Sequence, residues 1–145
     1  MRRTLGIMAV VAAVTISGWG PAHGSGADPI RGTEGDDYLK GTAGKDKIVA
    51  GQGDDYLVGH GANDILMGGR GFDHLWGGAG DDMAYDGPGS STVKLGKGDD
   101  TAVSDSDDAL DRIDCGPGQD IIRVLNVGDQ EDAFLNCEHI VDWSH

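Results

Sequence analysis

The sequence predicts an all-β protein built by stacking short units of nine residues, and three observations support this prediction. Gly accounts for 26 of the 145 residues, more than twice its usual share of about 7%. The acidic residues are 22 Asp and only 3 Glu. Because Asp favours turns whereas Glu favours helices, this ratio argues against a helical acidic surface. The third observation is a nine-residue repeat that runs through most of the chain.

The repeat is regular from residue 32 to residue 103, where the chain divides without a gap into eight nonamers. Gly stands at the fourth position and Asp at the sixth in seven of the eight units, and the eighth position is always apolar. In stacked repeats each unit leaves its apolar side to be covered by its neighbours. The expected core is therefore formed by the eighth-position residues Leu39, Ile48, Leu57, Leu66, Leu75, Ala84, Val93 and Ala102.

Two residues, Ser104 and Asp105, break the frame after the eighth unit. A degenerate unit then covers 106–114, and a clean one, CGPGQDIIR, covers 115–123. We therefore expect a repeat domain over 28–123, with regular repeats over 32–103 and degenerate repeats over 106–123.

The consensus of these units, G-G-x-G-x-D-x-U-x, resembles the RTX, or haemolysin-type, calcium-binding repeat. The resemblance covers residues 32–123. It implies a parallel β-roll, a right-handed β-solenoid in which six-residue turns bind several Ca²⁺ ions and three-residue strands form two parallel sheets. Carried onto this sequence, it makes ligands of the sixth-position residues Asp37, Asp46, Asp55, Asp64, Asp73, Asp82, Asp100 and Asp120.

The chemistry of the turn residues agrees with this resemblance. Gly adopts left-handed dihedral angles without steric cost and exposes backbone carbonyl oxygens, which are good ligands for a hard cation. Asp follows two residues later with a short carboxylate. Twelve Asp within residues 32–103 repel one another at neutral pH. We therefore expect metal binding and folding to be coupled.

If one coil contains two nonamers, the turns alternate between two sides of the roll. One side then carries the turns that end at Asp37, Asp55, Asp73 and Ser91, and the other carries those that end at Asp46, Asp64, Asp82 and Asp100. Gaps between stacked turns allow up to six ions. Because Ser91 replaces a carboxylate, we expect the weakest site beside it and the end of the regular roll near Val103.

The N-terminal segment has the features of a secretory signal peptide over residues 1–27. Arg2 and Arg3 precede an uncharged, mostly apolar stretch from residue 5 to residue 19, and small residues then allow cleavage after Gly24 or Ala27. The apolar stretch is too short to span a bilayer comfortably. We therefore expect a secreted, extracellular protein without membrane insertion; an uncleaved anchor is the alternative.

The outward positions, seven and nine, separate into two different faces. The face of the even-numbered units is mostly apolar, and its apolar members include Ile65, Met67, Met83 and Tyr85. Three interpretations stay open for it: cover by the C-terminal segment, contact between copies in a homo-oligomer, or contact with a partner. The face of the odd-numbered units is aromatic and basic, and it could either stack on sugar rings or form an ordinary β surface. It contains Tyr38, Tyr56, Trp76, Lys40 and Lys94.

The C-terminal segment, 124–145, is apolar-rich and lacks the nonamer. A repeat array needs a cap over its last open edge, so we expect this segment to be the cap. The chain has two cysteines, Cys115 in the last unit and Cys137 in the cap. In a secreted protein, two cysteines predict a disulfide.

Composition and motifs also exclude function classes. The formal net charge of −14 repels phosphate backbones, so nucleic-acid binding is not expected. No protease, hydrolase or nucleotide-binding motif occurs in the sequence, and we expect no enzymatic activity. The predicted function is a secreted calcium-binding repeat protein; the alternative is a calcium-dependent adhesion module for a cell surface or polysaccharide.

Overall fold

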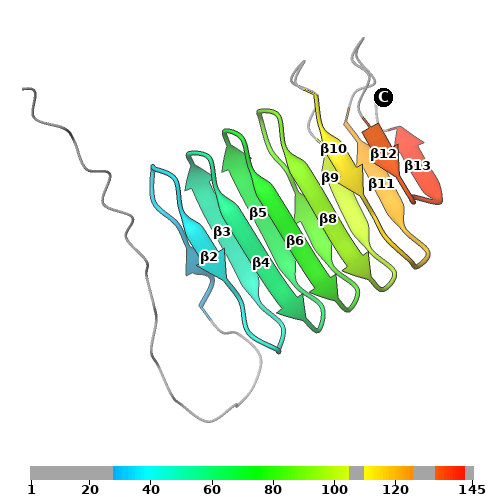
Figure 1. Ribbon diagram of the computed structural model, residues 1–145, viewed down its shortest axis with the longest axis horizontal. Helices are drawn as coiled ribbons and strands as arrows, with labels where there is room; N and C mark the ends of the chain where they lie inside the picture. Colours follow the sequence, from blue (N-terminus) through cyan, green and yellow to red (C-terminus); the bar gives the residue numbers. More distant parts are fainter. Residues whose placement is uncertain (1–27, 105–109, 126–132, 143–145) are drawn as a thin grey trace, which may run out of the picture.

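The computed structural model describes residues 28–104, 110–125 and 133–142. Within these residues the chain forms thirteen short β-strands and no helix. The strands lie in two parallel sheets, and successive coils follow one another along the long axis of the molecule (Figure 1). The all-β parallel roll predicted from the repeat is confirmed. The predicted signal peptide, 1–27, lies outside the described residues.

Consecutive strands alternate between the two sheets. The seven-stranded sheet has the order β1 (Ile30–Arg31), β3 (Lys47–Gln52), β5 (Ile65–Arg70), β7 (Met83–Tyr85), β9 (Thr101–Ser104), β11 (Ile121–Val124) and β13 (His139–Asp142). The six-stranded sheet has the order β12 (Ala133–Leu135), β10 (Arg112–Asp114), β8 (Thr92–Lys97), β6 (His74–Ala79), β4 (Tyr56–Gly61) and β2 (Tyr38–Lys40).

The strand register shows that one coil contains two nonamers. Tyr38 pairs with Tyr56, Tyr56 with His74, and His74 with Thr92, each 18 residues further along the chain. The same spacing relates Lys47 to Ile65 in the other sheet. The turns therefore alternate between two sides of the roll, as predicted.

Most inner strands are longer than the three residues that we expected. Strands β3, β4, β5, β6 and β8 each contain six residues. The reason is that backbone pairing continues into the first half of the turn. For example, Gly53 N donates to Arg70 O at 2.9 Å and Gly71 N donates to Pro88 O at 3.1 Å.

The glycines of the turns permit this close stacking. Gly69 has a φ of 114°, and a Cβ added to it would overlap the carbonyl oxygen of Gly51 in the preceding coil. Any other residue would therefore be strained in conformation and would push the two coils apart. Carbonyl oxygens of one turn thus face the α-carbons of the next.

The core is a thin layer of apolar side chains between the two sheets, and each sheet contributes one column of them. All eight predicted eighth-position residues are buried, which confirms that expectation. Ile113 and Ile122 extend one column each, and first-position side chains widen the core at Ala50, Leu95 and Cys115. Because the core is only this thin layer, each coil depends on its neighbours for burial.

The stack continues beyond the break in the frame. The paired residues of β8 and β10, and those of β9 and β11, are 20 residues apart instead of 18, because two residues have been inserted between them. The C-terminal segment supplies β12 and β13, which pair in parallel with β10 and β11. The regular spacing therefore ends near Val103, whereas the ladder of strands does not.

The predicted disulfide joins Cys115 to Cys137, whose Cα atoms are 5.3 Å apart. It links the first residue of one turn to the following coil. The described part of the C-terminal segment lies at the ends of both sheets and does not cover the apolar face (Figure 1). Ile65 on that face is 37% exposed.

Candidate calcium sites in the turns

The sixth-position carboxylates are buried inside the turns of the roll. Asp73 and Asp120 are fully buried, and Asp55, Asp64, Asp82 and Asp100 are nearly so. A buried carboxylate is costly unless hydrogen bonds or an opposite charge compensate it. The hydrogen bonds of each carboxylate oxygen therefore determine what these turns can bind.

One oxygen of each carboxylate links two coils. On the side of the even-numbered units, the backbone N–H of each sixth-position Asp donates to Oδ1 of the corresponding Asp one coil later. The distances are 2.8 Å for Asp46 to Asp64, 2.8 Å for Asp64 to Asp82, 2.7 Å for Asp82 to Asp100 and 2.8 Å for Asp100 to Asp120. The frame break alone does not determine the side of Asp120, and these hydrogen bonds place it on the side of the even-numbered units.

The other side carries the same ladder of hydrogen bonds from backbone N–H groups to carboxylates, with one interruption. Asp37 N donates to Asp55 Oδ1 at 2.8 Å, and Asp55 N donates to Asp73 Oδ1 at 3.0 Å. Ser91 has no carboxylate to continue the series from Asp73. The ladder then resumes, because Ser91 N donates to Asp111 Oδ1 at 2.8 Å.

The second oxygen of the inner carboxylates has no hydrogen-bond partner in the structure. This holds for Oδ2 of six predicted ligands: Asp55, Asp64, Asp73, Asp82, Asp100 and Asp120. Buried polar atoms are nearly always paired, so each such atom needs an explanation. A cation within the turn would satisfy these oxygens, and the residues therefore fit a bound Ca²⁺.

Carboxylates alone do not complete such a site. Within the described residues, no three His, Cys, Asp or Glu side chains converge to hold an ion. Ca²⁺ takes six to eight oxygen ligands, and backbone carbonyls are common among them. Carbonyl oxygens at the second and fourth positions, such as those of Gly51 and Gly53, point along the stack toward the next turn. The turns therefore offer a mixed set of carboxylate and carbonyl oxygens.

The environment of these carboxyls opposes their ionisation when no cation is present. Burial raises the pKa of Asp82 from 3.8 to about 7, and neighbouring carboxylates at Asp100 and Asp64 add to the effect. Burial likewise raises the pKa of Asp55 and Asp100 to about 6. The pKa values of the other three inner carboxyls, Asp64, Asp73 and Asp120, are raised for the same main reason.

The first two turns differ from the inner ones. Asp37 Oδ2 accepts hydrogen bonds from Thr33 N at 2.6 Å and Thr33 Oγ1 at 2.9 Å. Asp46 Oδ2 is held in the same way by Thr42, at 2.5 Å and 2.9 Å. Threonine occupies the second position in these two units, where inner units have Gly or His60. In these two turns, protein hydrogen bonds therefore satisfy the carboxylate oxygen that has no partner in the inner turns.

The sequence analysis missed two acidic residues that extend the ladders. Asp111 occupies the sixth position of the degenerate unit and accepts the hydrogen bond from Ser91 N. Glu138 Oε2 accepts from Asp120 N at 2.8 Å and ends the even side. The position of Asp111 in its nonamer could have identified it. Glu138 lies in the segment 124–145, which has no nonamer to give its register.

Fifth-position carboxylates accept a second, exposed set of hydrogen bonds, which run in the opposite direction along the stack. Asp54 N donates to Asp36 Oδ1 at 2.9 Å, and Asp99 N donates to Asp81 Oδ1 at 3.1 Å. In these pairs the later coil donates to the earlier one. The two Asp of each Asp-Asp pair therefore have different roles, and the buried sixth-position residue is the one with an oxygen left for an ion.

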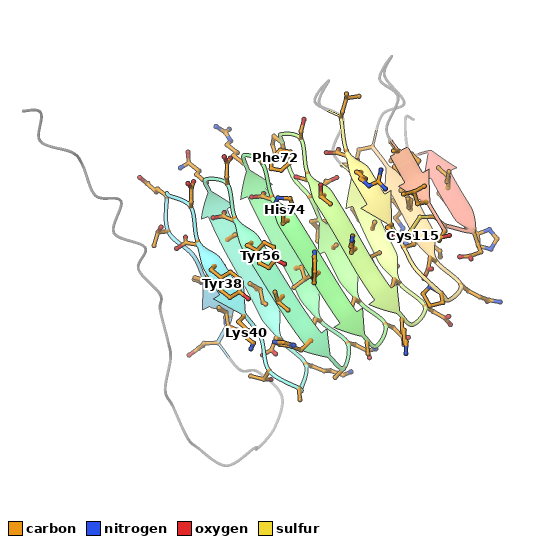
Figure 2. The ribbon with its side chains drawn as sticks, in the orientation of Figure 1. Tyr38, Lys40, Tyr56, Phe72, His74 and Cys115 are labelled. Atoms are coloured by element: carbon orange, nitrogen blue, oxygen red, sulfur yellow. A yellow bond between two sulfur atoms is a disulfide. The ribbon has the colours of Figure 1, made fainter. Side chains whose placement is uncertain are left out.

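The aromatic face lies on the six-stranded sheet. Figure 2 shows Tyr38, Tyr56 and His74 in a row across its strands. The rings of Tyr38 and Tyr56 stack with centroids 5.2 Å apart, and the Trp76 ring is 5.8 Å from that of Tyr56. Lys94 Nζ lies 5.6 Å from the centre of the Trp76 ring. This row is continuous along three coils.

Among the described residues, no helix has the length and apolar character to span a bilayer. No curated protein and no solved structure shows a significant match to the chain. The model of the RTX calcium-binding nonapeptide repeat (4 copies) matches residues 24–57, 58–85 and 76–110. These matches span more than half of the chain and contain five of the six inner carboxylates. With its parallel roll and its buried turn carboxylates, the chain belongs to the RTX calcium-binding nonapeptide repeat family.

Proposed function

We propose that the protein is a secreted, non-catalytic module that binds several Ca²⁺ ions in its turns and folds when it binds them. The observation that carries this proposal is the set of six buried carboxylates whose Oδ2 atoms lack a hydrogen-bond partner. They lie in two rows, one along each side of the roll. Ca²⁺ would neutralise their charge and supply the missing contact.

The same carboxylates explain why folding depends on the ion. Without Ca²⁺, the roll buries ionised groups in rows beside a thin apolar core. Their mutual repulsion and loss of hydration oppose folding at neutral pH. With Ca²⁺, the free energy of binding becomes free energy of folding.

Circular dichroism of the purified protein during a Ca²⁺ titration tests this proposal. We expect a largely unfolded spectrum in chelator and a β spectrum at millimolar Ca²⁺, with Mg²⁺ at the same concentration as the control. Mg²⁺ demands a small, regular octahedral shell and loses its water reluctantly, so it should be less effective. Identical spectra with chelator and with Ca²⁺ would overturn coupled folding.

Secretion rests on the N-terminal segment and needs a separate test. The full chain should be exported from an expressing cell, and N-terminal sequencing of the exported protein should begin at Ser25 or Asp28. A charged residue in the apolar stretch, Val11→Asp, should keep the protein inside the cell. Export of that variant at the normal level would argue against the signal peptide.

The exposed aromatic row supports a second candidate, the binding of a polysaccharide. Tyr38 is 58% exposed and Trp76 is 44% exposed, and aromatic rings with a polar edge suit stacking on sugar rings. Lys94, over the Trp76 ring, would favour an anionic polymer. The net charge of −14 opposes such a polymer at low salt, so binding depends on short-range contacts.

Retention of the calcium-loaded protein on immobilised polysaccharides tests this second candidate. Trp76→Ala should abolish retention, whereas Tyr85→Ala, which removes a ring from the other sheet, should preserve it. No retention of the unmutated protein on any polymer, or equal retention of both variants, would count against an adhesion role.

A further inference from the structure

The seventh nonamer, residues 86–94, departs from the repeat at two positions that are related to each other. Its first position is Asp86 where most units have Gly, and its sixth position is Ser91 where the other seven regular units have Asp. The unit therefore keeps one carboxylate in its turn, but at the opposite end.

First-position side chains lie beside the sixth-position carboxylate of the same unit. A Cβ added to Gly32 would be 2.7 Å from Asp37 Oδ2, and one added to Gly41 would be 2.8 Å from Asp46 Oδ2. The carboxylate of the same unit is also the nearest neighbour at Gly59, Gly68 and Gly77. The Cβ of a first-position Asp therefore lies next to the place that Oδ2 of a sixth-position Asp occupies in other units.

The turn that stacks on 86–91 one coil later shows this adjacency directly. Ser104 follows Asp86 by 18 residues and pairs with Val124 in the same sheet. Its Oγ donates to Asp111 Oδ2 at 3.1 Å. Ser104 precedes the degenerate unit 106–114, but its pairing places it where a first-position residue follows its strand, and Asp111 is the sixth-position residue of that unit. The two residue types are therefore reversed relative to the seventh nonamer. A first-position side chain thus reaches the sixth-position side chain across the turn.

The interior of the turn 86–91 contains two buried polar side chains. Asp86 is 1% exposed and Ser91 is 2% exposed. Asp86 Oδ1 accepts from Gly87 N at 2.7 Å, and the Ser91 hydroxyl is buried without a hydrogen-bond partner.

The preceding coil places one more oxygen beside this turn. Asp73 Oδ2 is buried and has no hydrogen-bond partner. A Cβ added to Gly68 would touch this oxygen and would lie 2.7 Å from Asp86 O, so the Asp73 carboxylate lies next to the backbone of Asp86. The turn 86–91 therefore contains a buried hydroxyl and a buried carboxylate of its own, and its backbone lies next to an unsatisfied carboxylate oxygen of the preceding coil.

We propose that Asp86 is a Ca²⁺ ligand of the turn 86–91 that replaces its missing sixth-position carboxylate. This assignment rests on the proposed calcium-binding function. It gives this turn one buried carboxylate, as in a regular inner turn. It also differs from the sequence-based expectation that the site beside Ser91 is the weakest.

Equilibrium dialysis of the purified protein against Ca²⁺ tests the assignment through the number of ions bound. Asp86→Asn and Asp86→Gly should each bind one ion fewer than the unmutated protein. Ser91→Asp alone should not tighten binding, because it places a second carboxylate beside the first. The double variant Asp86→Gly with Ser91→Asp restores the consensus and should recover the lost ion. Asp36→Asn, in an exposed fifth position, is the control and should bind the full number.

Circular dichroism at saturating Ca²⁺ separates loss of a ligand from loss of the fold, because Asp86→Asn preserves the acceptor for Gly87 N. Full Ca²⁺ stoichiometry in both Asp86 variants would overturn the assignment alone. Failure of the double variant to recover the ion while it remains folded would overturn it as well. Absence of bound Ca²⁺ in the unmutated protein would overturn the proposed function and this assignment together.

Discussion

The backbone N–H of Asp82 donates to Oδ1 of Asp100 at 2.7 Å, whereas Oδ2 of both residues is buried without a hydrogen-bond partner. Each carboxylate thus divides its two oxygens between two tasks. One oxygen joins adjacent coils, and the other remains for an ion. The same side chain therefore links the backbone of the roll to its bound metal.

The first prediction separates these two tasks with neighbouring residues. Asp82→Asn keeps an acceptor for the backbone but removes the buried charge, so we expect the Ca²⁺ midpoint to rise by about tenfold or more. The calcium-free roll should become more stable, because a buried repulsive charge is gone. Asp81→Asn, next to it but exposed, should change stability by less than about 0.5 kcal/mol. Ca²⁺ titration measures the midpoint, and urea unfolding measures the stability. If Asp82→Asn and Asp81→Asn changed both quantities equally, the separate role of the buried Oδ2 in ion binding would be contradicted.

The second prediction concerns pH in the absence of Ca²⁺. The folded-state pKa is raised to about 7 at Asp82 and to about 6 at Asp55. A raised pKa means that the folded roll binds more protons than the unfolded chain, so stability is lost as pH rises through this range. The calcium-free protein should therefore be most structured below about pH 4 and least structured above about pH 7. Circular dichroism of the calcium-free protein across this range would contradict the prediction if structure increased with pH.

The third prediction is the opposite pH dependence of Ca²⁺ binding. Ca²⁺ needs the ionised carboxylates, so protons compete with it. If one proton is displaced per ion, the Ca²⁺ midpoint should rise about tenfold for each pH unit below the pKa of the site. Titrations at pH 7.5, 6.5 and 5.5 measure this slope. A midpoint that is independent of pH would mean that the buried carboxyls do not bind the ion.

The fourth prediction concerns the N-terminal end. Thr33→Val preserves the shape of the side chain but removes the hydroxyl that donates to Asp37 Oδ2 at 2.9 Å. We expect a loss of about 1 kcal/mol in the free energy of unfolding, both with and without Ca²⁺ wherever the roll is folded. Thr101→Val, on a half-buried outward position of β9, is the matched control. An effect of Thr33→Val that appears only at low Ca²⁺ would indicate that Asp37 also binds an ion.

The fifth prediction concerns the disulfide at the other end. Replacing Cys115 and Cys137 together by Ser opens a link between residues that are 22 positions apart. We expect a loss of roughly 3 kcal/mol in the free energy of unfolding. Urea unfolding at saturating Ca²⁺ measures it, with reduced unmutated protein as the second sample. Equal stability of the variant and the oxidised protein would show that the link does not constrain the unfolded chain.

The sequence predicts the roll well because its information is periodic. The position of Leu66 in its nonamer is enough to place it in the core, and the position of Asp64 is enough to place it in a turn. What the period cannot predict is the consequence of departures from it. The inserted residues after Val103 suggest an end to the roll, but a turn can absorb extra residues while the strands keep their pairing.

The roles of individual carboxylates depend on contacts between coils, and a linear pattern contains no such distances. Asp37 and Asp55 are equivalent in the repeat, yet Thr33 occupies the second oxygen of the first and leaves that of the second unsatisfied. In the sequence alone, Asp86 is only a replacement of the usual first-position Gly. Its relation to Ser91 requires the geometry of the turn.

The direction of the buried hydrogen bonds makes the two ends of the molecule unequal. In both rows the sixth-position amides that donate to a carboxylate donate toward the C-terminus, and the even series ends where Asp120 N donates to Glu138 at 2.8 Å. Trimming coils from the N-terminus would uncover carboxylate oxygens, which water solvates readily. Trimming from the C-terminus would leave an amide of the interior without its acceptor. Shortened versions of this protein should therefore tolerate loss of the first coil better than loss of the last.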